Sequence, residues 1–158
     1  GRHPSGARIY VDYAHTPDAL ETVLKALKPH VRGKLHVVFG CGGDRDKTKR
    51  KIMGEIAAAE AEVIYVTDDN PRSEDSATIR AEILKGCPVA QNIGDRARAI
   101  QLSVSSLTKG DILLVAGKGH EQGQTIGTEV KEFDDVSVVR SAIAALEQND
   151  TDYQRKAN

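Results

Sequence analysis

The stretch that decides the fold is Val63-Ile64-Tyr65-Val66-Thr67-Asp68-Asp69-Asn70-Pro71-Arg72, near the middle of the chain. Its first four residues are apolar or β-branched and are typical of a buried strand. An acid, an amide and a guanidinium follow directly, and ligands of an open α/β sheet bind where its strands end. The stretch therefore predicts a strand that leads into a binding loop. The alternative is an ordinary strand-to-helix turn, because Asp, Asn and Pro are common turn formers.

Apolar runs of the same kind recur along the chain, and each is followed by a polar loop and a helical pattern. This alternation is typical of βαβ units that build a mainly parallel sheet. We therefore predict an α/β fold, a Rossmann-like open sheet of about six strands with helices on both faces. The main strands are predicted at residues 8–13, 34–39, 62–67, 88–93 and 111–116, and a lesser sixth strand at 129–133.

Helix signals separate these runs. Thr16 and Pro17 are residue types of an N-cap and of a first helical position, and apolar residues then recur at helical spacing until a stop near Gly33. Asp134 or Asp135 is expected to cap a last helix that extends to residue 146. The other helices are predicted at residues 47–61, 75–85 and 95–107.

The two ends of the chain differ from its centre. Residues 1–7 hold two glycines among polar residues and are predicted to be an interdomain linker. Residues 8–148 are predicted to form one domain, and the polar residues 149–158 a disordered tail. The chain does not begin with Met, so we expect it to be a piece of a longer protein.

The composition is ordinary for a globular domain, with 158 residues, 39% hydrophobic and 28% charged. A net charge of −1 and an aromatic fraction of 4% argue against nucleic-acid binding. The apolar runs are much shorter than the roughly 20 residues of a membrane span, and no signal peptide opens the chain. The sequence therefore indicates a cytoplasmic protein, in which Cys41 and Cys87 are expected to be reduced thiols.

Two glycine-containing segments also follow predicted strands. Residues 40–47, Gly-Cys-Gly-Gly-Asp-Arg-Asp-Lys, place Arg45 before a helix, where an anion is favoured. Their glycines fit neither a P-loop nor a dinucleotide fingerprint, and a tight turn is the alternative interpretation. Residues 116–121 offer the Glu121 carboxylate and the Gly117 carbonyl, which both can accept hydrogen bonds from an amine.

The charges of these loops suit a zwitterionic ligand such as an amino acid. The planar fork of Arg72 fits a carboxylate, Asp69 can hold a cationic amine, and Asn70 can donate and accept. Asp12 and His15, at the end of the first predicted strand, are candidates for contacts with a nucleotide. Because parallel strands end at one edge, we expect all of these groups around one crevice.

Four segments occur here in the order of a known family: Asp12-Tyr13-Ala14-His15-Thr16-Pro17, Phe39-Gly40-Cys41-Gly42-Gly43-Asp44-Arg45-Asp46, Asp69-Asn70-Pro71-Arg72 and Gly117-Lys118-Gly119-His120-Glu121. They resemble the C-terminal domain of the Mur ligases, and more narrowly the MurE group of UDP-N-acetylmuramoyl-alanyl-glutamate:meso-diaminopimelate ligases. The resemblance covers about residues 8–146. Where the family commonly has Lys-Arg-Pro, this chain has Lys49-Arg50-Lys51, so a lysine replaces a proline at a helix start.

The resemblance implies an ATP-dependent amide ligase of peptidoglycan synthesis, and so a role in cell wall biogenesis, cell shape, cell division and the cell cycle. In that family ATP phosphorylates the glutamate carboxylate of the nucleotide-linked peptide, and the amine of the incoming amino acid attacks the acyl phosphate. An ATP-binding central domain carries the P-loop and the Mg²⁺ ligands, and an N-terminal domain binds UDP. Both would lie outside this chain, so we expect a monomeric domain that has no catalytic or metal-binding residue and is inactive alone.

The resemblance also implies which residues bind the substrates. L-Lysine lacks the second carboxylate of meso-diaminopimelate and would leave Arg72 buried without a partner, at a cost of roughly 1.5–3 kcal/mol for each charged hydrogen bond lost. Asp12 and His15 match the family motif that faces the nucleotide. The diaminopimelate site would fall on Arg45, Asp69, Asn70, Pro71, Arg72, Gly117 and Glu121.

Other functions stay open beside this one. A lysine-adding ligase and a folylpolyglutamate synthetase belong to the same superfamily, but the Asp-Asn-Pro-Arg string at residues 69–72 argues against both. A stand-alone α/β module that binds an anion or an amino acid would use the same loops without any other domain.

Overall fold

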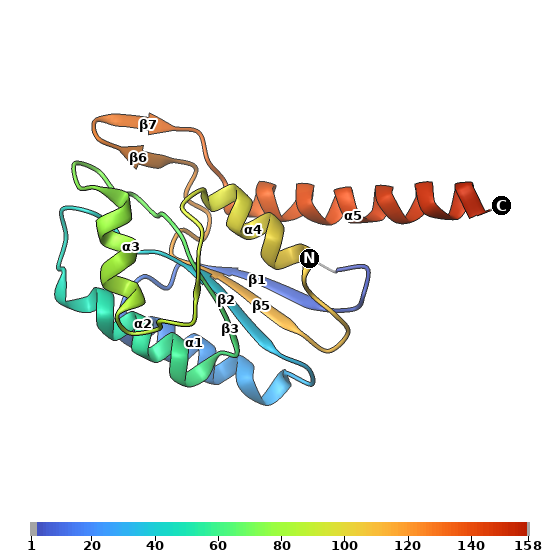
Figure 1. Cartoon of the computed structure of the whole chain (residues 1–158), viewed down its shortest axis with the longest axis horizontal. Helices are drawn as coiled ribbons and strands as arrows, with labels where there is room; N and C mark the ends of the chain where they lie inside the picture. Colours follow the sequence, from blue (N-terminus) through green and yellow to red (C-terminus); the bar gives the residue numbers. More distant parts are fainter. Residues whose placement is uncertain (1–2, 158) are drawn as a thin grey trace.

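The computed structural model describes residues 3–157 and contains a sheet of five parallel strands in the order β1-β5-β2-β3-β4 (Figure 1). Every neighbouring pair in this sheet is parallel. The prediction of an α/β fold with a mainly parallel open sheet is therefore confirmed. The strands are β1 (Arg8–Asp12), β2 (Leu35–Phe39), β3 (Val63–Val66), β4 (Gln91–Asn92) and β5 (Ile112–Ala116).

Helices cover both faces of the sheet (Figure 1). Successive residues of a strand point to opposite faces, so Val37 packs in one core and Val38 in the other. Because both faces are covered, the central strands read as continuous apolar runs. One face carries α1 (Pro17–Leu27), the short 3-10 helix η1 (Lys28–His30), α2 (Thr48–Glu60) and α3 (Ser76–Leu84), and the other carries α4 (Arg96–Ser105) and α5 (Asp135–Ala157).

Side-chain caps begin several of these helices, and the cap at Thr16 was predicted. The Thr16 hydroxyl accepts a hydrogen bond from the Ala19 amide at 3.2 Å, and Pro17 is the first residue of α1. Asp75 and Asp95 cap α3 and α4 in the same way. These caps satisfy amides that have no partner inside the helix. They also fix where the loop before each helix ends.

The predicted sixth strand does not join the main sheet. Residues 129–131 form β7 (Glu129–Lys131), which pairs antiparallel with β6 (Gln124–Ile126), a strand that was not predicted. Gly127 has a φ of +61° in the tight turn between them. A turn this short can join antiparallel neighbours but not parallel ones, which need a long crossover. The strand predicted at 88–93 is also shorter, because β4 is an exposed edge strand of two residues.

Residues 1–2 of the predicted linker and residue 158 of the predicted tail lie outside the described residues, and the rest of both segments is ordered. Helix α5 continues to Ala157, so the expected disordered tail is wrong for residues 149–157. The Gln148 amide donates to Asp152 and the Thr151 hydroxyl to the Glu147 carbonyl, both with helical spacing. At the other end His3 is buried, and its Nε2 donates to the Val104 carbonyl at 2.8 Å, so part of the predicted linker packs on the domain.

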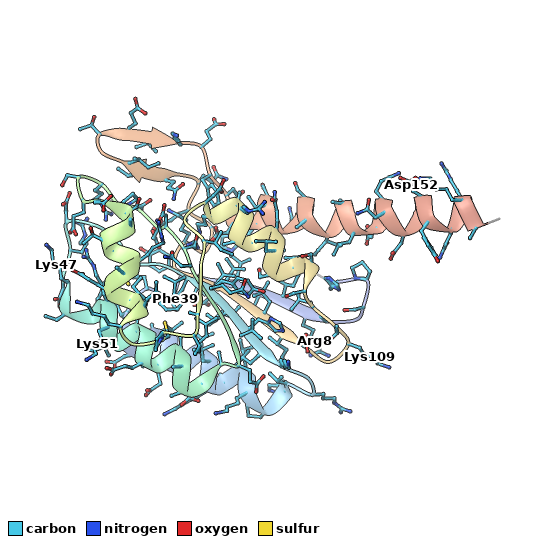
Figure 2. The ribbon with its side chains drawn as sticks, in the orientation of Figure 1. Arg8, Phe39, Lys47, Lys51, Lys109 and Asp152 are labelled. Atoms are coloured by element: carbon cyan, nitrogen blue, oxygen red, sulfur yellow. The ribbon has the colours of Figure 1, made fainter. Side chains whose placement is uncertain are left out.

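The ends of the parallel strands define two edges of the molecule. Figure 2 shows Lys47 at the carboxyl edge and Arg8 and Lys109 at the opposite, amino edge, with the buried Phe39 between them. Within residues 3–157, no helix is both long and apolar enough to span a bilayer.

Candidate functional site

A cavity of about 290 Å³ lies at the carboxyl edge of the sheet, between the loops that follow β1, β2, β3 and β5. Its lining mixes guanidinium and carboxylate groups, as expected for a crevice that holds a zwitterion. Seven of the nine predicted site residues line it: His15, Arg45, Asp69, Asn70, Arg72, Gly117 and Glu121. The lining also includes Tyr13, Thr16, Gly40, Cys41, Gly42 and Lys49, which were not predicted to be site residues.

Arg72 is held in place through its backbone as well as its side chain. Its φ of +51° lies in the left-handed region, which a non-glycine residue occupies when its surroundings hold it there. The Arg72 amide donates to the Thr125 carbonyl of β6 at 3.1 Å, and its own carbonyl accepts from the Gly127 amide at 2.6 Å. The hairpin β6–β7 therefore fixes the residue that was expected to bind a carboxylate.

The guanidinium of Arg72 reaches across to the loop after β2. Its NH1 donates to the Gly43 carbonyl at 2.9 Å and, more weakly, to the Asn70 carbonyl at 3.4 Å. Within residues 3–157, its Nε and NH2 donate to no protein group. One side of the guanidinium thus ties the two loops together, and the other side remains for a ligand.

Pro71 shapes the site without lining the cavity. Its carbonyl packs so closely against Gly43 that a Cβ on Gly43 would lie 1.8 Å from the Pro71 oxygen. Next to this contact, Asp44 has a φ of +54° and accepts a hydrogen bond from the Ser73 hydroxyl at 2.6 Å. The glycine loop and the Asp-Asn-Pro-Arg loop therefore interlock, and Pro71 contributes to that fit.

Asp69 and Gly117 bring the loops after β3 and β5 together. Asp69 is buried, and a Cβ on Gly117 would lie 2.7 Å from its Oδ2. The φ of +118° at Gly117 also favours glycine. On the other side, the Lys118 ammonium lies 3.5 Å from Asp69 Oδ1 and is itself fully buried. Burial lowers the pKa of Lys118, whereas the Asp69 carboxylate acts in the opposite direction.

Arg50 holds the glycine loop, residues 40–47, through a hydrogen bond. Its side chain is fully buried, and its NH2 donates to the Gly42 carbonyl at 3.2 Å and to Glu74 at 3.0 Å. Its NH1 donates to Glu82 at 2.7 Å. The next residue, Lys51, is exposed in the first turn of α2, where its ammonium lies 3.8 Å from Glu55. Lysine in place of the family's proline is therefore accommodated without a break in the helix.

The contacts of Glu74 predict how stability depends on pH. Hydrogen bonds from the Arg50 side chain and then the Asp44 amide lower the pKa of Glu74 from 4.5 to about 2. A carboxyl group whose pKa is lowered by folding stabilises the native state above its ordinary pKa, and this stability is lost as the pH falls through the folded pKa. We expect urea midpoints to fall between about pH 4.5 and 2, with a smaller fall in Glu74→Gln. An equal fall in Glu74→Gln and in the wild type would contradict this, and Glu55→Gln, on the exposed face of α2, is the matched control.

A buried ion pair that was not predicted fixes two strand ends behind the cavity. Arg96 and Asp135 are both fully buried, with 2.7 Å between Arg96 NH2 and Asp135 Oδ2. Arg96 also donates to the Ala116 carbonyl at the end of β5, at 3.0 Å, and to the Asp68 carbonyl after β3, at 3.3 Å. The capping role expected of Asp134 or Asp135 is taken by Asp134, which accepts from the Val136 amide at 3.0 Å.

The two residues expected to face a nucleotide differ in their relation to the cavity. His15 lines it, donates from Nδ1 to the Tyr13 carbonyl at 3.0 Å and meets the Tyr13 ring edge-on. Asp12 does not line the cavity in the described part of the chain, and its carboxylate accepts from the Ala14 amide at 2.9 Å. Its carbonyl accepts from the amides of Gly117 and Gly119, so Asp12 holds the loop after β5.

The cysteines are free thiols, as predicted. Cys41 lines the cavity but is 3% exposed, and burial raises its pKa to about 12. A thiol with such a pKa is protonated at neutral pH and is no nucleophile. Residues 3–157 contain no group of three or more His, Cys, Asp or Glu side chains that could hold a metal ion.

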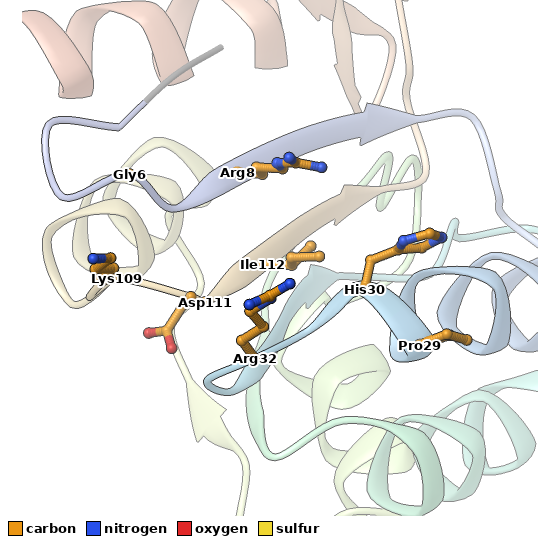
Figure 3. Close-up of a pocket in the computed structure, with 9 residues that line it drawn as sticks. Gly6, Arg8, Pro29, His30, Arg32, Lys109, Asp111 and Ile112 are labelled. Carbon is orange, nitrogen blue, oxygen red and sulfur yellow. The ribbon is translucent and has the colours of Figure 1, made fainter.

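A larger cavity of about 590 Å³ lies at the amino edge, and none of the predicted site residues lines it. Figure 3 shows Arg8 on β1 and Ile112 on β5 with His30 and Arg32 across from them. Its basic side chains are exposed and lie where strands begin, whereas ligands of open α/β sheets bind where strands end. The cavity at the carboxyl edge is therefore the candidate site.

Comparisons with known proteins identify the family of this chain. A family model described as Mur ligase, glutamate ligase domain, matches residues 1–119. A curated ligase of Caulobacter vibrioides, named UDP-N-acetylmuramoyl-L-alanyl-D-glutamate–2,6-diaminopimelate ligase, is 56% identical over 147 residues, which are 93% of this chain and 30% of that protein. The ligase of the same name from Mesorhizobium japonicum is 59% identical over 143 residues, 90% of this chain and 30% of its own length.

Solved structures show the same relationship. A structure of a ligase with this same name superposes with a TM-score of 0.84 at 48% identity, over 88% of this chain and 29% of its own. A folylpolyglutamate synthase/dihydrofolate synthase from Yersinia pestis shares the fold alone, with a TM-score of 0.56 at 18% identity over 88% of this chain and 28% of its own. This chain spans about 30% of the length of the curated relatives it matches. On the family match and these identities, the chain belongs to the Mur ligase, glutamate ligase domain family.

Proposed function

We propose that this chain is the amino-acid-binding domain of a longer, cytoplasmic, ATP-dependent ligase that adds meso-diaminopimelate to UDP-N-acetylmuramoyl-alanyl-glutamate in peptidoglycan synthesis. The observation that carries the proposal is the mixed charge of the cavity at the carboxyl edge. Arg45 and Arg72 line it with positive charge, and Asp69 and Glu121 with negative charge. Proteins with 56% and 59% identity carry the name of this ligase.

Each group of the cavity has a role in this proposal. Arg72 and Arg45 bind carboxylates of meso-diaminopimelate, while Asp69, Glu121 and the Gly117 carbonyl accept hydrogen bonds from an ammonium group. Asn70 completes the carboxylate site, and Pro71 keeps the loop in shape through its contact with Gly43.

ATP and Mg²⁺ belong mainly to other domains of the complete ligase in this proposal. The sequence has no P-loop, and residues 3–157 offer no cluster of metal ligands. His15 and Asp12 are proposed to meet the nucleotide from this side. The domain would then carry the amino acid toward the acyl phosphate, so its contribution to the reaction is proximity and orientation.

A titration of this chain tests the proposal. We expect meso-diaminopimelate to shift the amide NMR signals of Arg45, Asn70, Arg72 and Gly117, and L-lysine to shift them less at equal concentration, because it lacks the second carboxylate. Equal shifts with both ligands would favour a lysine-adding ligase. If neither ligand shifts these signals in this chain and neither is a substrate of the complete ligase, the proposal is wrong.

A further inference from the structure

The buried ammonium of Lys118 makes contacts that the proposed binding roles do not use. Lys118 lies between the two glycines of the loop after β5, and its side chain is fully buried. Its Nζ donates to Asn70 Oδ1 at 2.8 Å and to the Gly123 carbonyl at 2.8 Å, and it lies 3.5 Å from Asp69 Oδ1. A buried lysine is costly unless its donors are satisfied, so these contacts define where it must lie.

The neighbours of Asn70 decide which way its side-chain amide points. One end of that amide meets both Lys118 Nζ, at 2.8 Å, and the backbone amide of Thr125, at 2.9 Å. Both neighbours are donors and neither can accept a hydrogen bond, so this end has to be the oxygen. The reversed amide would set its NH₂ group against two donors at hydrogen-bond distance.

The other end of the amide, Nδ2, is consequently left for the cavity that Asn70 lines. Among residues 3–157, no group accepts a hydrogen bond from Nδ2. An amide held in this way offers a donor and no acceptor to a ligand, so it favours a carboxylate oxygen and disfavours an ammonium group at that point.

We propose that Lys118 is a positioning residue, which holds the Asn70 amide so that Nδ2 faces the cavity and makes the site selective for a ligand carboxylate. The inference rests on the proposed function for the identity of the ligand, and on the contacts above for the role of Lys118. Lys118 acts through Asn70 and needs no contact with the ligand.

A double-mutant cycle in the complete ligase tests this role. In the wild-type background, Lys118→Met should raise the KM for meso-diaminopimelate by about tenfold or more, since the oriented donor is lost. It should change the KM for ATP by less than about twofold and spare most of kcat at saturating meso-diaminopimelate. In an Asn70→Ala background the same substitution should raise the KM for meso-diaminopimelate by less than about twofold.

The matched control is Lys109→Met, which removes an exposed lysine at the amino edge and should leave each of these constants unchanged. Equal effects of Lys118→Met with and without Asn70 would overturn the proposal, because a purely structural lysine acts in both backgrounds. Loss of the Asp69 contact does not mimic the expected result, since an uncompensated Asp69 would attract the ligand ammonium more strongly.

A second variant keeps the test decisive if Lys118→Met does not fold. Asn70→Asp retains an oxygen for Lys118 and Thr125 but replaces the Nδ2 donor by a charged acceptor. It should fold and raise the KM for meso-diaminopimelate at least as much as Asn70→Ala does, and an unchanged KM would overturn the proposal.

The orientation of Asn70 can also be measured without any ligand. In this chain the side-chain NH₂ signal of Asn70, assigned by its loss in Asn70→Ala, should move in Lys118→Met or Lys118→Gln and stay in place in Lys109→Met. An unmoved signal would overturn the role of Lys118. A complete ligase that does not use meso-diaminopimelate would instead refute the proposed function, and the NMR result would still decide the role of Lys118.

Discussion

Arg72→Ala in the complete ligase should lower kcat/KM for meso-diaminopimelate by about 10³-fold or more, and change the KM for ATP by less than about twofold. The guanidinium lines the cavity, and on our proposal it pairs with a carboxylate of the ligand. Alanine would leave that carboxylate without its charged partner in the bound state. The measurement is steady-state kinetics with each substrate varied in turn.

Two further variants separate charge from geometry at this position. Arg72→Lys keeps the positive charge but loses the planar fork, so it should recover only part of the activity. Arg32→Ala removes an exposed arginine at the amino edge and should leave kinetics unchanged. A parallel loss of ATP affinity in Arg72→Ala would show that the residue acts on the whole site, and would count against a specific role in amino-acid binding.

Asp135→Ala should lower the free energy of unfolding by about 3–5 kcal/mol, the usual cost of leaving one charge of a buried pair alone. Arg96 would remain fully buried, and its hydrogen bonds to the Ala116 and Asp68 carbonyls would have to hold a charge that nothing neutralises. Urea unfolding at neutral pH, followed by circular dichroism, measures the change.

The control for this prediction is Glu55→Ala, which breaks the exposed contact with Lys51 and should cost less than about 1 kcal/mol. The double variant Arg96→Met with Asp135→Leu should recover stability relative to Asp135→Ala, because apolar residues of similar size avoid the burial of charge. A loss below 1 kcal/mol in Asp135→Ala would mean that water or a rearrangement compensates Arg96.

Features encoded by neighbouring residues were predictable from the sequence. The strand β3 follows from four adjacent apolar residues, and the start of α1 follows from Thr16 and Pro17. The convergence of Arg45, Asp69 and Glu121 on one cavity also followed, because parallel strands end at one edge. The roles of these residues as ligand contacts remain predictions.

Features that depend on distant pairs were not predictable in this way. Arg96 and Asp135 meet across 39 positions of sequence, and nothing in either segment indicates the partner. Residues 124–126 form a short, partly exposed strand with little apolar character. Their sequence therefore has no clear strand pattern that would predict the pairing with β7. Lys118 belongs to the segment 117–121 that resembles the family. Its burial, however, depends on contacts with Asn70 and Gly123, which only the folded loop brings to it.

The strand order has a consequence for how the domain folds during synthesis. β5 lies between β1 and β2, so the first two strands of the chain never pair with each other. β1 stays without a sheet partner until Ile112–Ala116 has left the ribosome, and loops that close over such distances slow folding. Until then β1 and one edge of β2 have no strand partner. Their unpaired backbone groups and apolar side chains are then open to association with other chains. Folding of this domain is therefore completed late in its own translation, by a strand from its last third.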